Sequence, residues 1–468
     1  MKRPQIFLLV LITWVLPVCA AENFNLKDFG GVGDGATLNT SALQKAIDAC
    51  TKAGGGVVRV PSGRYVIGTV EMKSYVTLSL DHGAELLGSQ KMEDYPIDQI
   101  QPAREGQSHC LFYAKDATNI QLQGLGVIDG RGDPDHFPRR SGPRGKDTRP
   151  RLFRFENCEN LTFSGLTYKN PAFWGIHLID CHKAHFTGVT VRMRNNNYNN
   201  DGIDLDGCED VLIENCDIAA GDDGICLKSS KNPCRKIVVQ NCRVSSNTAA
   251  LKFGSSSHGG FIDIDVHNCY FYDCPMGAIK LQLVDGGQLE NVSISRIVME
   301  DVGNPIFIRL GNRGQKYGAE ESKVVGTIKN IRISDIVAKV TIEDREKAAA
   351  AHYKRRKVDR TPGVTDKEKS KAGPIMITGI PSHLVEDVVL ENIKISYPGH
   401  GSQADAKREV AEDIARYPEQ YFFGVLPAWG AYIRHAKNIQ FKNVTMTLRG
   451  PDERQKIVLN DVEDFVEE

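Results

Sequence analysis

The chain has 468 residues, of which 41% are hydrophobic, and its formal net charge is −1. A chain of this length and apolar fraction can bury a large core. A net charge so close to zero argues against nucleic acid or an anionic membrane as a partner, because both are bound through excess positive charge.

The N-terminus has the features of a secretory signal. Lys2 and Arg3 precede the apolar run "IFLLVLITWVLPV", and "VCA" supplies small residues for cleavage near Ala20. We therefore predict a signal peptide over residues 1–20 and a secreted or periplasmic protein. The run is shorter than the roughly 20 residues of a membrane span, and no later stretch is apolar enough to be one. A minor alternative is a lipoprotein anchored at Cys19, because "LPVC" resembles a lipoprotein signal.

An amphipathic helix is predicted in "TSALQKAIDACTKAGGG". Its apolar positions follow the i, i+3, i+4, i+7 pattern of one helical face and are Leu43, Ala46, Ile47 and Cys50. Thr40 or Asn39 is suited to cap the start, and Gly54 to end the helix. We expect this helix to cover the open end of the repeat that follows it.

A repeat of about 22 to 28 residues runs from roughly residue 57 to 450. Each unit has two short alternating strands around a polar corner, as in "CEDVLIENCDIAA" and "CRKIVVQNCRVSS", and then a third strand, as in "DGICLKS". Three strands at a fixed period are typical of a coil that stacks on itself in parallel. We predict an all-β protein, a single right-handed parallel β-helix domain over residues 21–468, and we expect a monomer.

The cysteines follow the same repeat. Cys216, Cys242 and Cys269 recur at intervals of 26 and 27 residues, and each follows an asparagine. This indicates stacked interior thiols rather than a disulfide framework. The alternative is a disulfide between Cys226 and Cys234 or between Cys269 and Cys274, since export permits disulfides.

Two acidic copies one repeat apart form the candidate site. They are "NNDGIDLDG" and "AAGDDGICLKS", headed by Asp201 and Asp223, with Asp222 beside the second. Adjacent coils place equivalent positions about 4.8 Å apart, so three carboxylates should crowd one outward-facing patch. Repulsion between them raises at least one pKa and keeps one acid protonated, which suits glycoside hydrolysis. The alternatives are a ladder of acidic corners or a calcium site.

These motifs resemble glycoside hydrolase family 28, the polygalacturonase family of pectin-degrading enzymes. "NNDGID" and "GDDGICLKS" resemble its N-T-D-G-x-D and G-D-D motifs, and "NPAFWGIHLIDC" resembles its Trp-x-x-His strand. The resemblance implies that Asp222 is a general acid. It also implies that Asp201 and Asp223 position water for inverting hydrolysis of α-linkages in a uronic-acid-containing, pectic polysaccharide or oligosaccharide.

Two departures from that family are visible. The position of the family's histidine, one 26-residue step after Asp223, is Ala249, and His258 lies nine residues further on. The family's R-I-K strand is "GAIKLQL" here, which offers Lys280 without a preceding arginine. Recognition of galacturonate by paired Arg and Lys is therefore not secured by the sequence.

Further residues are candidates for binding an anionic sugar. Third strands of successive coils carry Lys228, Lys252 and Lys280, which would form a cationic strip if they point outward. Arg309 and Arg313 are suited to grip a carboxylate. Trp174 is a candidate to stack on a sugar or pack under the site, His177 to support it, and His258 to reach it from a loop. Solvated charge or core packing is the alternative for each.

Three insertions interrupt the repeat, at about 130–151, 343–374 and 400–430, and in a coil of this kind insertions often line the binding face. Long loops that block one end of a cleft would favour exo attack, which is a hypothesis. The stretch 139–154 is basic and suggests an anionic ligand or solvated charge through Arg139, Arg140, Arg144, Lys146, Arg149, Arg151 and Arg154.

Other chemistries receive less support. No paired C-x-x-C motif indicates zinc, and we expect no metal and no cofactor. A calcium-dependent polysaccharide lyase with a Lys or Arg base fits the same coil. A non-catalytic carbohydrate-binding β-helix is the third alternative, although clustering three aspartates is costly without a use for them.

Overall fold

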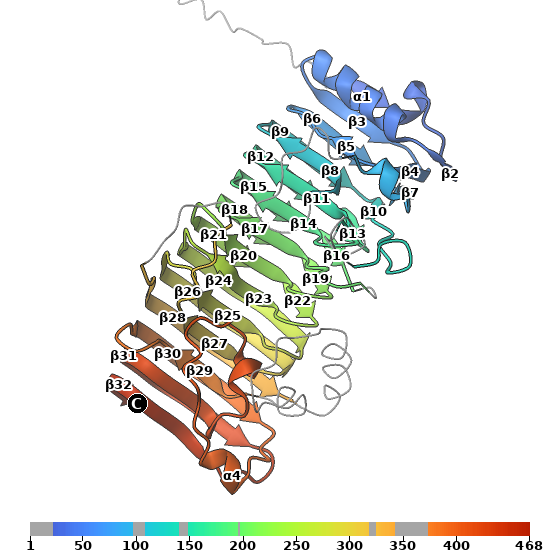
Figure 1. Cartoon of the computed structure of the whole chain (residues 1–468). Helices are drawn as coiled ribbons and strands as arrows, with labels where there is room; N and C mark the ends of the chain where they lie inside the picture. Colours follow the sequence, from blue (N-terminus) through green and yellow to red (C-terminus); the bar gives the residue numbers. More distant parts are fainter. Residues whose placement is uncertain (1–21, 97–107, 140–147, 195–196, 318–323, 342–372) are drawn as a thin grey trace, which may run out of the picture.

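The chain forms an elongated, right-handed parallel β-helix, which confirms the predicted fold class (Figure 1). The computed structural model describes residues 22–96, 108–139, 148–194, 197–317, 324–341 and 373–468. The predicted signal peptide with Cys19 and most of the insertion 343–374 lie outside these residues. Among the described residues, no helix combines the length and the apolar character needed to cross a membrane.

Three faces of parallel strands make up the coil. Face 1, which carries the candidate site, consists of β5 (Val70–Glu71), β8 (Cys110–Lys115), β11 (Arg151–Glu156), β14 (Ile176–Ile179), β17 (Ile203–Asp206), β20 (Ile225–Ser229), β23 (Leu251–Ser257), β25 (Ile279–Leu283), β27 (Ile306–Leu310) and β29 (Ile375–Thr378). Face 2 begins with β1 (Asn23–Asn25), β3 (Gly56–Val60), β6 (Val76–Leu80), β9 (Thr118–Gly124), β12 (Glu159–Ser164), β15 (His182–Thr187), β18 (Glu209–Glu214) and β21 (Cys234–Gln240).

Face 3 begins with β2 (Asp34–Leu38), β4 (Gly63–Ile67), β7 (Ala84–Gly88), β10 (Val127–Asp129), β13 (Thr167–Lys169), β16 (Thr190–Arg192), β19 (Asp217–Ala220) and β22 (Arg243–Ser246). Longer strands then bend from face to face in the C-terminal coils: β24 (Phe261–Cys274), β26 (Gln288–Val302), β28 (Thr327–Val340), β30 (Val385–Tyr397), β31 (Ala428–Leu448) and β32 (Gln455–Glu467).

The core lies inside the coil and is built from columns of aliphatic side chains. On face 1 the register aligns Ile203, Ile225, Leu251, Ile279 and Ile306, all of them buried. Burying one such side chain contributes about 1.5–3 kcal/mol, so every added coil extends a continuous apolar column. Because side chains alternate along a strand, the residues next to this column point outward.

The predicted column of free cysteines is confirmed. All eleven cysteines of the described residues are free and buried, so neither Cys226 and Cys234 nor Cys269 and Cys274 form a disulfide. Cys216, Cys242 and Cys269 follow the corner between faces 2 and 3. Each of these thiols bonds the carbonyl two residues before it, at 3.1–3.3 Å. The preceding asparagines have φ near +55°, a left-handed conformation that asparagine adopts readily.

The predicted capping helix is α1 (Thr40–Lys52), at the N-terminal end of the coil (Figure 1). Its buried face comprises Ala42, Leu43, Ala46, Ile47 and Cys50, which confirms the predicted apolar face. The predicted capping bonds are wrong in detail. Asn39 stands at the N-cap, but its side chain bonds the Val32 backbone in both directions, and Thr40 Oγ1 accepts from Gly68 N. Gly54 follows the helix end at φ +94°.

The insertion 400–430 is largely irregular. It contains the short α4 (Gln403–Ala406) and a 3₁₀ turn, Gln420–Phe423. Two other 3₁₀ turns, Leu26–Phe29 and Met92–Asp94, lie near the N-terminus. The part after α4 returns toward earlier coils and reaches the candidate site.

Candidate active site

Asp201 and Asp223 occupy equivalent positions in adjacent coils, as the repeat predicts. Each stands two residues before a face 1 strand, β17 or β20, and Gly202 N donates to Asp223 O at 2.9 Å. Glycine is required between acid and strand, because a Cβ at Gly202 would lie 2.4 Å from Gly224 O. The repeat therefore brings the two aspartates side by side through the backbone ladder.

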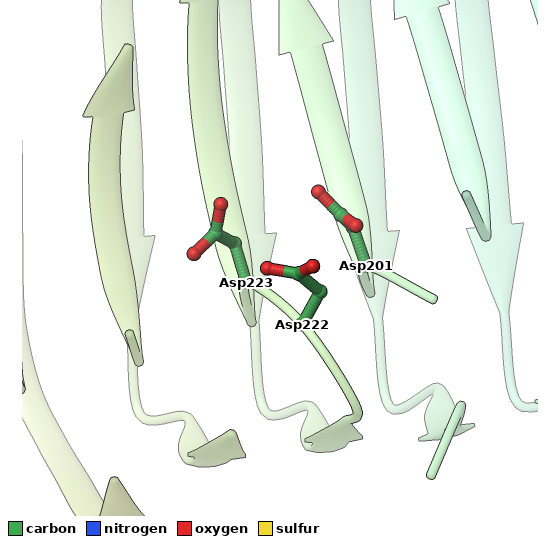
Figure 2. Close-up of side chains that lie close together, drawn as sticks. All are labelled: Asp201, Asp222 and Asp223. Atoms are coloured by element: carbon green, nitrogen blue, oxygen red, sulfur yellow. The ribbon is translucent and has the colours of Figure 1, made fainter. Parts of the chain in front are cut away.

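Asp222 completes a compact group of three carboxylates (Figure 2). One carboxylate oxygen from each of Asp201, Asp222 and Asp223 lies within 4.8 Å of the others. All three residues are buried, with 3–5% of their surface exposed. The prediction that the acids lie together is thus confirmed, but they are withdrawn from solvent rather than spread on an outer patch.

The three carboxyls do not share one electrostatic environment. Burial, followed by the charges of Asp204, Asp222 and Asp223, raises the pKa of Asp201 well above its usual range. One of the Asp201 carboxylate oxygens, Oδ1, is buried and has no hydrogen-bond partner among the described residues. Burial and the neighbouring carboxylates therefore favour the protonated form of Asp201 over its ionised form.

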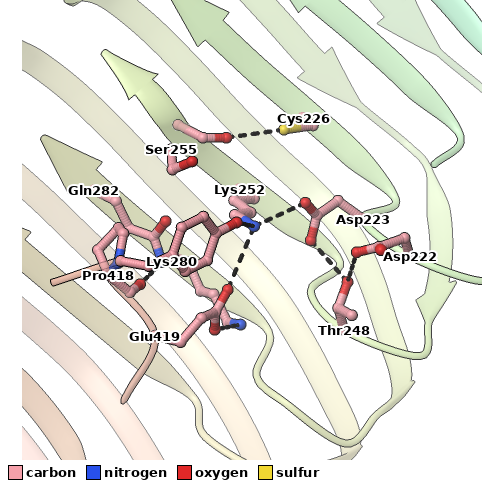
Figure 3. A network of polar contacts seen from close by, with 12 residues as sticks. Asp222, Asp223, Cys226, Thr248, Lys252, Ser255, Lys280, Gln282, Pro418 and Glu419 are labelled. Carbon is pink, nitrogen blue, oxygen red and sulfur yellow. Dashed lines mark hydrogen bonds and ion pairs between the residues drawn. The ribbon is translucent and has the colours of Figure 1, made fainter. Parts of the chain in front are cut away.

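Asp223 is held as a carboxylate. Burial raises its pKa, but Lys252, Lys280 and Lys228 outweigh burial and bring the pKa of Asp223 to about 2. Lys252 Nζ lies 2.9 Å from Asp223 Oδ2, and Thr248 Oγ1 donates to Asp223 Oδ1 at 2.7 Å (Figure 3). The same hydroxyl is 3.2 Å from Asp222 Oδ1, so Thr248 links the two adjacent acids. The cluster thus places Asp223, held as a carboxylate, beside Asp201, whose carboxyl binds a proton more readily than an ordinary aspartate does.

The predicted cationic strip is only partly correct. Lys252 and Lys280 are register partners, whereas Lys228 pairs with Asp206, two positions further along its strand. All three lysines are buried rather than outward in solvent. They are matched by carboxylates: Lys228 Nζ lies 3.6 Å from Asp204, Lys252 contacts Asp223, and Lys280 contacts Glu419.

Glu419 comes from the insertion, on a segment that we call the strap (residues 410–420). Its carboxylate lies between Lys252, 3.3 Å away, and Lys280, with which it forms a close ion pair (Figure 3). Tyr417 on the same segment accepts from Lys252 Nζ at 3.2 Å. These contacts could not be predicted from the sequence, because the strap stands outside the repeat and has no register of its own.

Arg309 and Arg313 have structural partners, which corrects their assignment to substrate carboxylates. Arg309 is buried and donates to the backbone carbonyls of Glu412 and Asp413 at 3.0 and 3.1 Å. Arg313 Nε donates to Asp285 at 2.9 Å, and its other nitrogens contact Ser255. Both guanidinium groups are thus occupied within the chain.

Trp174 and His177 pack beside the acids. Trp174 precedes β14 at the position equivalent to Asp201, and Lys228 Nζ lies 4.3 Å from its ring centroid. The His177 ring packs edge-on against Trp174. Burial, then Arg151, Lys228 and Arg154, lowers the pKa of His177 well below its usual range, so this imidazole is neutral.

His258 is not brought to the acids. It follows the C-terminal end of β23, where Ser257 pairs with Ser229, while Asp223 precedes the start of β20. Ala249 does stand one coil after Asp223, because Gly224 N donates to Ala249 O at 2.8 Å. Thr248, the residue before Ala249, contacts Asp222 and Asp223 instead, and it was not predicted from the sequence.

Part of the basic stretch 139–154 is also buried. Arg151 and Arg154 belong to β11, where Arg151 lies over Trp174 and Arg154 pairs with Glu156. Arg149 donates to Ala172 O and to Asn197. These three arginines are therefore buried against partners within the chain, whereas Arg140, Arg144 and Lys146 lie outside the described residues.

Removing the Lys252 charge should change how stability depends on pH. In the wild type, the depressed pKa of Asp223 stabilises the fold above about pH 4, and this contribution is lost as pH falls toward 2. Lys252→Met should cost about 3–5 kcal/mol of unfolding free energy at neutral pH, since it leaves buried carboxylates unmatched.

Thermal melts at pH 2 to 7 provide the measurement. We expect the difference between wild type and Lys252→Met to shrink toward pH 2. Lys236→Met, which removes an exposed lysine paired with Glu209, is the matched control and should follow the wild type. A difference in melting temperature between wild type and Lys252→Met that stays constant from pH 7 to pH 2 would contradict the assigned Asp223–Lys252 pair.

Known proteins resemble this chain in sequence and fold. A family model described as Glycosyl hydrolases family 28 matches residues 50–354. A probable polygalacturonase of Vitis vinifera is 30% identical over 342 residues, covering 68% of this chain and 69% of that protein. An exo-poly-alpha-D-galacturonosidase of Dickeya chrysanthemi is 27% identical and covers 52% of this chain and 49% of its own length.

Solved structures agree in fold. A family 28 exopolygalacturonase from Yersinia enterocolitica matches with a TM-score of 0.70 at 21% identity, over 95% of this chain and 78% of that one. A hyperthermoactive exopolygalacturonase from Thermotoga maritima gives 0.66 at 22% identity, over 80% and 87%. With the sequence match over residues 50–354, these findings show that the chain belongs to glycosyl hydrolases family 28.

Proposed function

We propose that the protein is an exported, exo-acting, inverting hydrolase of α-linkages in a uronic-acid-containing, pectic polysaccharide or oligosaccharide. The observation that carries this proposal is the cluster of Asp201, Asp222 and Asp223, in which the pKa of Asp223 is lowered to about 2 while that of Asp201 is raised, so that an ionised and a protonated carboxyl can stand side by side. Glycoside hydrolysis needs both states together, because one acid protonates the leaving oxygen while a carboxylate activates water.

The roles follow the family resemblance. Asp222 donates a proton to the glycosidic oxygen, and that bond to the anomeric carbon breaks. Asp201 and Asp223 hold a water that attacks the same carbon from the opposite side and gives up a proton to a carboxylate. The proton that this carboxylate takes from the water is then returned to Asp222 through solvent, which restores the general acid for the next turnover.

Substrate class, exo attack and export rest on different support. Relatives carry the names polygalacturonase, exopolygalacturonase and exo-poly-alpha-D-galacturonosidase, which favours a pectic substrate and attack at chain ends. The strap lies against face 1 on the C-terminal side of the acids, as expected for an insertion that limits one end of a binding site. The signal-like N-terminus supports export.

The alternatives are less well supported. A lyase would use the three carboxylates as cation ligands and a lysine as base. Lys252 is instead paired with Asp223 and Glu419, and membership of a hydrolase family favours hydrolysis. A non-catalytic binding module would not need three buried carboxyls with oxygens within 4.8 Å of one another.

Asp222→Asn should lose hydrolysis and keep the fold. The amide is isosteric but cannot donate the required proton, so we expect a loss of at least about 100-fold in kcat. Release of reducing ends from polygalacturonate measures the effect. Asp210→Asn is the matched control, because Asp210 is exposed and has a left-handed φ that asparagine accepts. Equal loss in both variants, or turnover by Asp222→Asn, would remove Asp222 from the acid role.

The anomeric form of the first product tests inversion. We expect the β-anomer to appear first when an α-linkage is cleaved, as followed by proton NMR before mutarotation. A retaining enzyme forms a covalent glycosyl-enzyme intermediate and works by double displacement, whereas an inverting enzyme works by a single displacement. An α-anomer as first product would therefore replace inversion by that double displacement.

A further inference from the structure

The strap places the carboxylate of Glu419 beside Lys252 and Lys280, which lie next to the acid cluster. Glu419 is 2% exposed, and each of its oxygens faces one lysine: Oε1 faces Lys252 and Oε2 faces Lys280. Lys252 also contacts Asp223, so Glu419 is separated from the candidate catalytic group by a single ammonium. Figure 3 shows these residues as one continuous network.

The position of Glu419 is fixed by a built-in row of donors. Three side chains of one outward-facing register column of face 1 donate to backbone carbonyls of the strap. Arg434 donates to Val410 and Ala411, Arg309 to Glu412 and Asp413, and Gln282 to Pro418. Gln420, just after Glu419, donates to Pro374 O at 3.1 Å. These hydrogen bonds therefore hold in place the backbone that carries Glu419.

The charges at this place are already matched. Lys252 and Lys280 bring two positive charges, and Asp223 and Glu419 bring two negative ones. A sugar carboxylate bound beside these lysines would add a third negative charge to a buried group. Unmatched buried charge is strongly unfavourable, and specificity is commonly achieved by such repulsion.

We propose that Glu419 takes the place of a substrate carboxylate, so that the sugar unit bound beside Lys252 and Lys280 carries no free carboxylate and is neutral or esterified. Glu419 is then a specificity-determining residue. The proposal rests on the proposed function, which it narrows: the polysaccharide is uronic-acid-containing overall, but one unit next to the scissile bond is uncharged.

The wild-type enzyme tests this directly with trigalacturonate and its three mono-methyl esters, each esterified at a different unit. We expect one mono-ester to exceed the free trimer at least tenfold in kcat/KM. Glu419→Gln removes one negative charge, so that Lys280 loses its ion pair and Lys252 keeps only that with Asp223, and the change should lower that ratio at least tenfold. Glu409→Gln, the same change at an exposed position next to the strap, should leave the ratio unchanged.

Binding separates this inference from the hydrolase proposal. Kd values for the same four trimers, measured by calorimetry in the Asp222→Asn background with and without Glu419→Gln, should show the same shift. Selective binding without any turnover by the wild type would uphold the inference and remove only the hydrolase function. The inference is overturned if the free trimer is cleaved or bound as well as every mono-ester, if Glu419→Gln leaves the ratio unchanged, or if no trimer binds.

Discussion

The register between parallel coils is the constraint on which the rest of the structure depends. Stacked strands place matching residues one strand spacing apart, whatever their chemistry. Inside the coil this makes aliphatic columns. On the outer side of face 1 the same register sets Asp201 beside Asp223 and Lys252 beside Lys280, so like charges are forced together. The candidate site is a consequence of that forced proximity.

Forced proximity of like charges is tolerable only if opposite charges are supplied nearby. Asp223 is stabilised by Lys252 in the next coil, while burial and the neighbouring aspartates raise the pKa of Asp201 and so favour its protonated form. The neighbours of Lys280 in its own column are Lys252 and Phe307, neither of them acidic, and the strap provides Glu419. The strap is therefore part of the charge balance of the site, and its anchoring by Arg309 and Arg434 serves that balance.

Features that repeat could be predicted from sequence, and features outside the repeat could not. The D-G-I copies placed Asp201 and Asp223 correctly because backbone register alone fixes them. Lys228 was misplaced because it stands three residues after Ile225, whereas Lys252 stands one residue after Leu251. Counting from the inward aliphatic residue would have shown the difference.

The contacts of the strap with the coil, and those of Thr248 with the acids, could not be predicted from the repeat. Arg309 looked available because its partners, the carbonyls of Glu412 and Asp413, are backbone atoms of an insertion about 100 residues later. Glu419 was missed for the same reason. The repeat predicts Ala249, not Thr248, as the residue one coil after Asp223. The hydroxyl that contacts both Asp222 and Asp223 nevertheless belongs to Thr248.

The most direct test of the central claim, that these carboxyls carry out hydrolysis, is the nature of the products. The purified protein would be incubated, with chelator present, on polygalacturonate, rhamnogalacturonan and sulfated polysaccharides, while reducing ends and near-ultraviolet absorbance are followed together. We predict reducing ends without absorbance, unaffected by chelator. Absorbance that disappears when chelator is added would show a cation-dependent lyase and contradict the roles given to Asp201, Asp222 and Asp223.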